Sequence, residues 1–213
     1  MTEFPSLNHG ERRGGVRPSL IVLHYTGMAS YAEARARLCD PVAEVSAHWL
    51  VSETGLAKAL VPEHRRAWHA GAGSWGGISD VNSHSIGIEL ANPGDRPFPE
   101  AQMAGLEALL MGVMGRWGIA PQGVIGHSDM APSRKGDPGR RFDWRRLALQ
   151  GLAVWPEARE APVQDFMGAL MRFGYADWPA EDVLNAFRLR FRPWADGGLN
   201  EVDRRIAAGL CDD

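Results

Sequence analysis

The sequence predicts an α/β fold, in which helices flank a mixed central β-sheet, followed by a small C-terminal three-helix bundle. Three observations support this prediction. Short β-type runs alternate with helical patterns up to about residue 150. The segment after residue 159 carries helical patterns only. A proline-containing stretch at 155–162 separates the two. Strands and helices that alternate along a chain favour an α/β architecture.

The predicted strands are five short runs of aliphatic and β-branched residues, each bounded by Gly, Pro, Ser, Asn or Asp. They span residues 19–26, 47–51, 57–61, 85–90 and 123–127. Helical patterns lie between them at 31–38, 100–117 and 142–149. The pattern over 100–117 is the strongest, because its apolar residues recur at three- and four-residue spacing between Pro99 and Gly118.

A domain boundary is predicted near 155–162, where two prolines and three charged residues fall within eight positions. We expect one domain over 1–158 and a helical domain over 159–213. The helices of the second are expected at 163–173, 180–191 and 199–210. A hydrophobic core that runs continuously through both parts would argue against this division.

Composition excludes some partners and suggests a compartment. The 213 residues include 23 basic and 26 acidic ones, a net charge of -3, which gives no reason to expect nucleic acid or an anionic membrane as the partner. No apolar run approaches the ~20 residues of a membrane span. The first residues carry no export signal and there are two cysteines, Cys39 and Cys211. We therefore expect a cytoplasmic protein, or a periplasmic one if a signal has been removed. The oligomeric state is not predicted.

Two histidines stand where ligands gather in α/β folds. His24 and His127 each end an apolar β-type run, so they could form a metal-binding pair, although structural histidines are the alternative. Asp137, ten residues after His127, could reach the same metal. Two His and one carboxylate leave a fourth position open, as in catalytic zinc sites. Asp129 is the second choice for the third ligand, and is more simply interpreted as a residue that orders the loop.

Glu89 is the candidate acid–base residue. Alternation along 85–90 places it on one strand face with Gly87 and Ala91, opposite the apolar residues. A carboxylate between two small residues has room around it, and a buried one needs a partner. The alternative is a strand edge that faces solvent. Lys135 is one of two lysines among the 23 basic residues, which suggests a compact point charge.

These residues carry a family resemblance. The matching segments, in order, are 23–26, 45–48, 67–71, 82 with 85–90, and 126–139. Together they resemble the zinc-dependent N-acetylmuramoyl-L-alanine amidases of the AmpD/AmiD type, the amidase 2 family, which is related to peptidoglycan recognition proteins. The resemblance implies one Zn²⁺ bound by His24, His127 and Asp137, with Glu89 as catalytic base and Lys135 stabilising the oxyanion. The candidate substrate-binding residues are Tyr25, Trp75 and Asn92.

The segments 173–175, 183–188 and 192–210 are similar to a three-helix peptidoglycan-binding domain. The implied activity is hydrolysis of the amide between N-acetylmuramic acid, in its 1,6-anhydro form, and L-alanine of muropeptides, in cell-wall recycling. The alternatives are an amidase acting on intact peptidoglycan and a non-catalytic recognition module. Truncation at about 158 is expected to leave zinc binding intact.

The sequence also departs from the family pattern. Glu44 and Asp80 stand where AmpD-type members carry arginines, so contacts to the peptide carboxylates cannot be transferred. The candidate replacements are Arg65, Arg66 and Arg134.

Overall fold

The computed structural model describes residues 5–210, and its centre is a five-stranded mixed sheet in the order β4-β3-β6-β2-β7. Neighbouring strands are parallel except β3 and β4. The five strands are β2 (Leu20–Tyr25), β3 (Trp49–Val51), β4 (Ala57–Ala59), β6 (Ser85–Leu90) and β7 (Val124–Gly126). A separate two-stranded ribbon joins β1 (His9–Gly10) to β5 (Arg66–Ala67). The predicted mixed α/β fold is confirmed.

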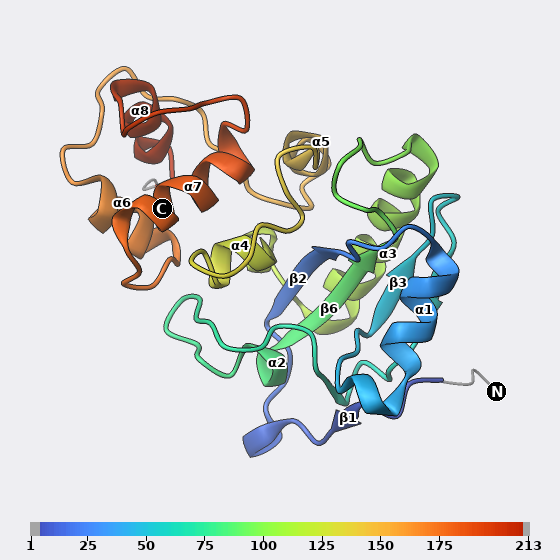
Figure 1. Ribbon diagram of the computed structural model, residues 1–213. Helices are drawn as coiled ribbons and strands as arrows, with labels where there is room; N and C mark the ends of the chain where they lie inside the picture. The colour runs from blue at the N-terminus through green and yellow to red at the C-terminus, as the bar shows by residue number, and fades with distance from the viewer. Residues whose placement is uncertain (1–4, 211–213) are drawn as a thin grey trace.

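Helices lie on both faces of this sheet, and three further helices joined by long loops make up the C-terminal part (Figure 1). They are α1 (Tyr31–Cys39), α2 (Val81–His84), α3 (Glu100–Trp117), α4 (His127–Met130), α5 (Trp144–Leu149), α6 (Phe166–Phe173), α7 (Ala180–Phe191) and α8 (Glu201–Ala208). Short 3-10 turns occur at Arg13–Gly15, Pro41–Ala43 and Pro121–Gly123. The strand predicted over 123–127 ends at Gly126, and His127 instead begins the single turn of α4. A single turn is too short to show helical periodicity.

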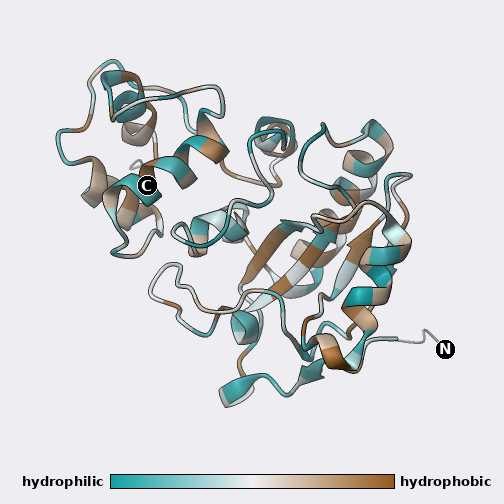
Figure 2. Ribbon diagram, viewed as in Figure 1, coloured by the Kyte–Doolittle hydropathy of each residue, from teal (hydrophilic) through white to brown (hydrophobic). Residues whose placement is uncertain are grey.

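Alternation along β2 places apolar residues on both faces of the sheet, as a central parallel strand requires. Ile21 and Leu23 pack with residues of β6, α3 and α5, whereas Leu20 and Val22 belong to the cluster on the other face. In Figure 2 β2 is correspondingly brown along most of its length, and β6 alternates between brown and pale segments. The sheet is therefore buried on both sides, and its open end is where polar side chains can be reached.

The C-terminal helices share an apolar cluster with the sheet. Leu20, Val22 and Ile125 of the sheet belong to one buried cluster with Phe166, Phe187 and other residues of the C-terminal part. In Figure 1, α4 lies between these helices and the sheet. Such a continuous core is the arrangement that argues against two independent units. The division into 1–158 and 159–213 as separately folding domains stays a prediction. Within residues 5–210, no helix has the length and apolarity to cross a membrane.

Candidate active site

Three adjacent strands bring the candidate residues to one end of the sheet. His24 on β2 pairs in register with Glu89 on β6, because the two strands run parallel. β7 lies on the other side of β2, and His127 follows it as the first residue of α4. Asp137 lies in the middle of the loop after α4, where its carbonyl oxygen accepts from the Ser128 N–H at 2.9 Å. The carboxyl ends of the strands therefore carry the site, as is usual in α/β folds.

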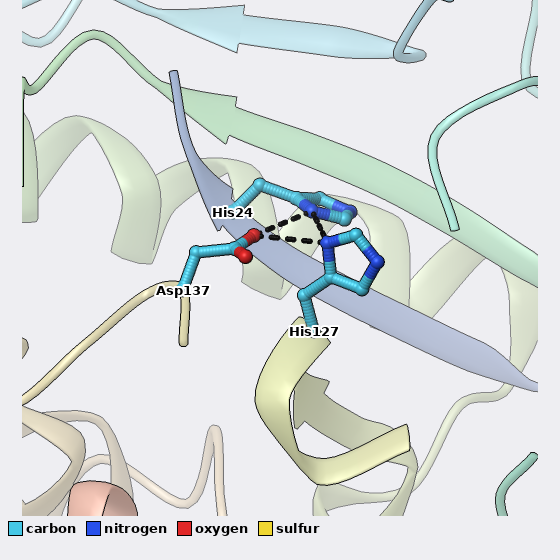
Figure 3. Close-up of side chains that lie close together, drawn as sticks. All are labelled: His24, His127 and Asp137. Carbon is cyan, nitrogen blue, oxygen red and sulfur yellow. Dashed lines mark hydrogen bonds and ion pairs between the residues drawn. The ribbon is translucent and has the colours of Figure 1, made fainter. Parts of the chain in front are cut away.

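His24, His127 and Asp137 converge on one point (Figure 3). The His24 Nδ1 atom lies 2.9 Å from His127 Nδ1 and 2.9 Å from Asp137 Oδ2. The His127 Nδ1 to Asp137 Oδ2 distance is 3.1 Å. All three side chains are buried. Between residues 5 and 210, these three are the His, Cys, Asp or Glu side chains whose ligand atoms lie close enough together to hold a metal ion.

Hydrogen bonds on the outer side of each imidazole determine where its proton lies. His127 Nε2 is 2.9 Å from the Ala70 carbonyl oxygen, which can only accept, so this nitrogen is protonated. The Ser85 hydroxyl donates to the Val81 carbonyl oxygen at 2.6 Å and so accepts from His69 Nε2 at 3.1 Å. His69 Nδ1 is then an acceptor, and His24 Nε2 donates to it at 3.0 Å.

Both Nδ1 atoms therefore direct lone pairs at each other and at a carboxylate, an arrangement that requires a cation. Burial and the neighbouring His127 lower the pKa of His24 to about 4, which keeps that imidazole neutral. Two neutral imidazoles and one carboxylate match the donor set of catalytic zinc, so the residues fit this metal.

Glu89 faces the same point from the next strand. Its Oε2 atom is buried and meets no hydrogen-bond partner within the described part of the chain. Burial, and then the charge of Asp137, raise the pKa of Glu89 to about 8, while Lys135 opposes them. Glu89 lies on a central strand, so the alternative of a solvent-facing sheet edge is wrong. A carboxyl group of this kind can exchange a proton near neutral pH.

A groove of about 460 Å³ lies over these residues. Tyr25, Lys135 and Arg134 line it, as does Arg37 of α1, which the sequence analysis did not identify. Two predicted substrate-binding residues lie elsewhere. Trp75 is 4% exposed, and its ring packs on Phe173 and Tyr175 in the cluster shared with the C-terminal helices.

Asn92 is 2% exposed and orders its own loop: its side-chain oxygen accepts from the Gly94 N–H at 2.7 Å. Of the arginines considered as replacements for Glu44 and Asp80, only Arg134 lines the groove. Arg65 pairs with Glu11, and Arg66 pairs with Asp80 at 3.1 Å.

Two further residues, Asp129 and His48, hold the surroundings of the site in place. Asp129 accepts from the Gly126 N–H at 2.8 Å and so orders the turn, which is the role expected of it if it is not a metal ligand. His48 is a buried core residue that accepts from the Gly87 N–H at 2.9 Å. Ser85 and the Ala70 carbonyl oxygen, which fix the imidazole protons, were not predicted. A serine in a strand and a backbone oxygen carry no distinctive sequence signal.

Comparison with known proteins agrees with this geometry. The family model described as N-acetylmuramoyl-L-alanine amidase matches residues 14–140. The chain is 34% identical to N-acetylmuramoyl-L-alanine amidase AmiD of Escherichia coli K12, over 90% of this chain and 81% of that protein. It is also 34% identical to 1,6-anhydro-N-acetylmuramyl-L-alanine amidase AmpD of Enterobacter cloacae, over 67% of this chain and 86% of that one.

Solved structures match nearly the full length, C-terminal helices included. E. coli AmiD in complex with the substrate anhydro-N-acetylmuramic acid-L-Ala-D-gamma-Glu-L-Lys superposes with a TM-score of 0.82 and 32% identity, over 95% of this chain and 96% of that one. AmpDh3 of Pseudomonas aeruginosa gives a TM-score of 0.83 and 30% identity, over 93% of this chain and 92% of that one. The chain therefore belongs to the amidase 2 family of N-acetylmuramoyl-L-alanine amidases.

Proposed function

We propose that this chain is a zinc-dependent amidase that hydrolyses the amide between N-acetylmuramic acid and the L-alanine of muropeptides. One observation carries the proposal: the ligand atoms of His24, His127 and Asp137 lie about 3 Å apart with their lone pairs converging, beside the unpartnered Glu89 carboxyl. A recognition module that does not cut has no use for a proton-exchanging carboxyl at this position.

His24, His127 and Asp137 would hold the zinc ion. When bound, zinc supplies a Lewis acid that acidifies water and polarises the scissile carbonyl. Glu89 accepts the proton of the attacking water and returns it to the leaving amine, a role that fits a buried carboxyl whose Oε2 atom has no partner among the described residues. Lys135 lines the groove, where its ammonium stabilises the oxyanion that develops on the carbonyl.

The 1,6-anhydro form of the sugar is the proposed substrate, with cell-wall recycling in the cytoplasm as the setting. Support comes from the similarity to AmpD, whose name specifies the 1,6-anhydro sugar, and to AmiD, whose structure holds an anhydro-muropeptide. The second candidate is an amidase that acts on intact peptidoglycan. It is favoured by the C-terminal helices, which resemble a peptidoglycan-binding domain and are shared with AmiD and AmpDh3.

The decisive experiment compares purified anhydro-muropeptide with intact sacculi as substrates. Each is incubated with the protein, with the chelator-treated protein, and with that protein after zinc is restored, and the products are identified by mass. Release of the free peptide from muropeptide, lost in chelator and recovered with zinc, is expected. Faster cleavage of sacculi would replace recycling by wall degradation, and full activity in chelator would rule out the zinc mechanism. Cell fractionation of the unmodified chain tests the cytoplasmic location.

A further inference from the structure

Asp129, two residues after the proposed ligand His127, is the centre of a buried polar network that joins the two parts of the chain. Its Oδ2 atom accepts from the Gly126 N–H at 2.8 Å and from Arg190 Nη1 at 2.7 Å. Its Oδ1 atom accepts from the Tyr175 hydroxyl at 2.7 Å. The side chains of Asp129 and Arg190 are 0% and 1% exposed. A carboxylate buried this deeply needs these donors, two of which come from the C-terminal part.

The turn that this network holds is the one that presents the ligands. The helix α4 has four residues, and an isolated turn of this length is unstable because nucleation is costly. Asp129 ties the turn to Gly126 on the strand side. The Ser128 N–H ties it to the carbonyl oxygen of Asp137, the third proposed ligand. The position of Asp129 therefore sets the backbone positions of both His127 and Asp137.

Arg190 fixes Asp129 relative to the sheet. Its Nη2 atom donates to the carbonyl oxygen of Val124 on β7 at 3.1 Å, and its guanidinium lies 4.4 Å from the Trp144 ring centroid. The guanidinium is thus held by a strand, by a ring of α5 and by the Asp129 carboxylate together. Without Arg190, the buried Asp129 would lose its charge partner and its side chain would have to move toward water.

A second buried pair on the same helix serves as a comparison. Arg188 of α7 bonds Asp203 of α8 at 2.6 Å, with side chains 6% and 0% exposed. This pair stabilises the C-terminal helices internally and does not involve α4. The two arginines share helix, burial and type of partner. They differ in whether the partner adjoins the metal site, and Asp203 also has a second cation, Arg192, at 2.9 Å.

On these grounds, and resting on the zinc site proposed above, we propose that Arg190 and Tyr175 are positioning residues for the metal centre, acting through Asp129. The C-terminal helices are then part of the scaffold that shapes the zinc site, beyond any binding of peptidoglycan. Truncation at about 158 would remove both donors, so we expect it to weaken zinc binding, contrary to the expectation from the sequence.

The experiment measures the zinc affinity of the full-length protein by competition with a chromophoric chelator, and the visible spectrum of the cobalt-substituted protein. Arg190→Met should weaken zinc binding by about 10- to 100-fold, the range typical of residues that orient ligands, and should alter the cobalt spectrum. Arg190→Lys should recover part of the affinity. The matched Arg188→Met variant should stay within about threefold of the wild type, because its partner is remote from the ligands.

The outcomes separate this inference from the proposed function. A wild-type protein that binds no zinc would remove the proposed function itself. Wild-type affinity in Arg190→Met, or an equal loss in Arg188→Met and Arg190→Met, would overturn the positioning role and leave a general stabilising one. If Arg190→Met does not fold, Tyr175→Phe decides, because it removes only a hydroxyl. Unchanged zinc affinity and an unchanged cobalt spectrum in that variant would overturn the inference.

Discussion

The proposed metal centre has a strand half and a loop half. His24 and Glu89 belong to neighbouring central strands and stand in register, so the sheet itself fixes them. His127 and Asp137 belong to the segment 127–139, of which only the first turn is helical. That segment is held by contacts to distant residues, such as the Ala70 carbonyl oxygen and Arg190. The comparison teaches that two ligands of one ion can depend on different parts of the fold.

The largest expected effect comes from removing a ligand in either half. His24→Ala and His127→Ala should each lose zinc and turnover, because each removes one of the three proposed protein ligands. The two variants should then differ in their sensitivity to trypsin. Losing the His127 bond to Ala70 should expose 134–141 to trypsin, whereas His24→Ala should leave that segment protected. Metal analysis and limited trypsin digestion measure both effects. Equal trypsin sensitivity would contradict the comparison.

The next largest effect separates proton transfer from charge stabilisation. Glu89→Gln should keep zinc and the fold, yet lower kcat by about 10²- to 10⁴-fold, the usual contribution of an acid–base residue. Lys135→Met, in the loop half, should lower kcat more than it raises KM, since its charge acts on the developing oxyanion. Steady-state kinetics on anhydro-muropeptide provide the test. A Glu89→Gln enzyme within tenfold of wild type would remove the assigned role.

A smaller effect probes the space beside the strand half. Gly87 lies against the His69 ring, and an added Cβ would come within 2.4 Å of its Cγ. Gly87→Ala should displace His69, weaken its hydrogen bond with His24, and lower zinc affinity by about 10- to 100-fold. Gly136→Ala, in the loop half, is the matched control, because a Cβ there meets nothing within 4 Å. Chelator competition compares the two. Similar affinities would show that His69 does not orient His24.

The smallest expected effect is a pH dependence of stability in the metal-free protein. Burial raises the pKa of Glu89 from 4.5 to about 8, so between these values the unfolded state releases a proton that the folded state keeps. The folded protein therefore loses stability as pH rises through this window, by at most about 1.4 kcal/mol per pH unit.

Glu89→Gln, which cannot ionise, should therefore gain about 1–2 kcal/mol of unfolding free energy relative to wild type between pH 5 and pH 8. The gain is smaller than the shift alone would give, because Glu89 also borders the groove and keeps some contact with water. Denaturant titrations at the two pH values measure the gain, with the exposed Glu53→Gln variant as control. No pH-dependent difference would mean that Glu89 ionises freely in the folded protein.

The site residues of both halves could be predicted from the sequence, but the contacts that hold the loop half could not. Alternation around Glu89 and the apolar run before His24 are local patterns, and they predicted the sheet, its faces and two site residues. The role of Arg190 depends on its contact with Asp129, 61 positions away, and no local pattern specifies that pairing. The burial of Trp75 could not be predicted for the same reason. Its neighbours in the sequence do not indicate that Phe173 and Tyr175 cover it.

The hydrogen bonds that orient the two imidazoles have a consequence for how the protein is made in the cell. They end on the carbonyl oxygens of Ala70 and Val81, and the three apolar clusters of the fold involve none of the ligands. We therefore expect the metal-free chain to fold with its imidazoles already oriented, unlike a zinc finger, which is unfolded without its ion. The converging lone pairs of the two imidazoles and the carboxylate would then favour uptake of the proposed zinc ion after folding.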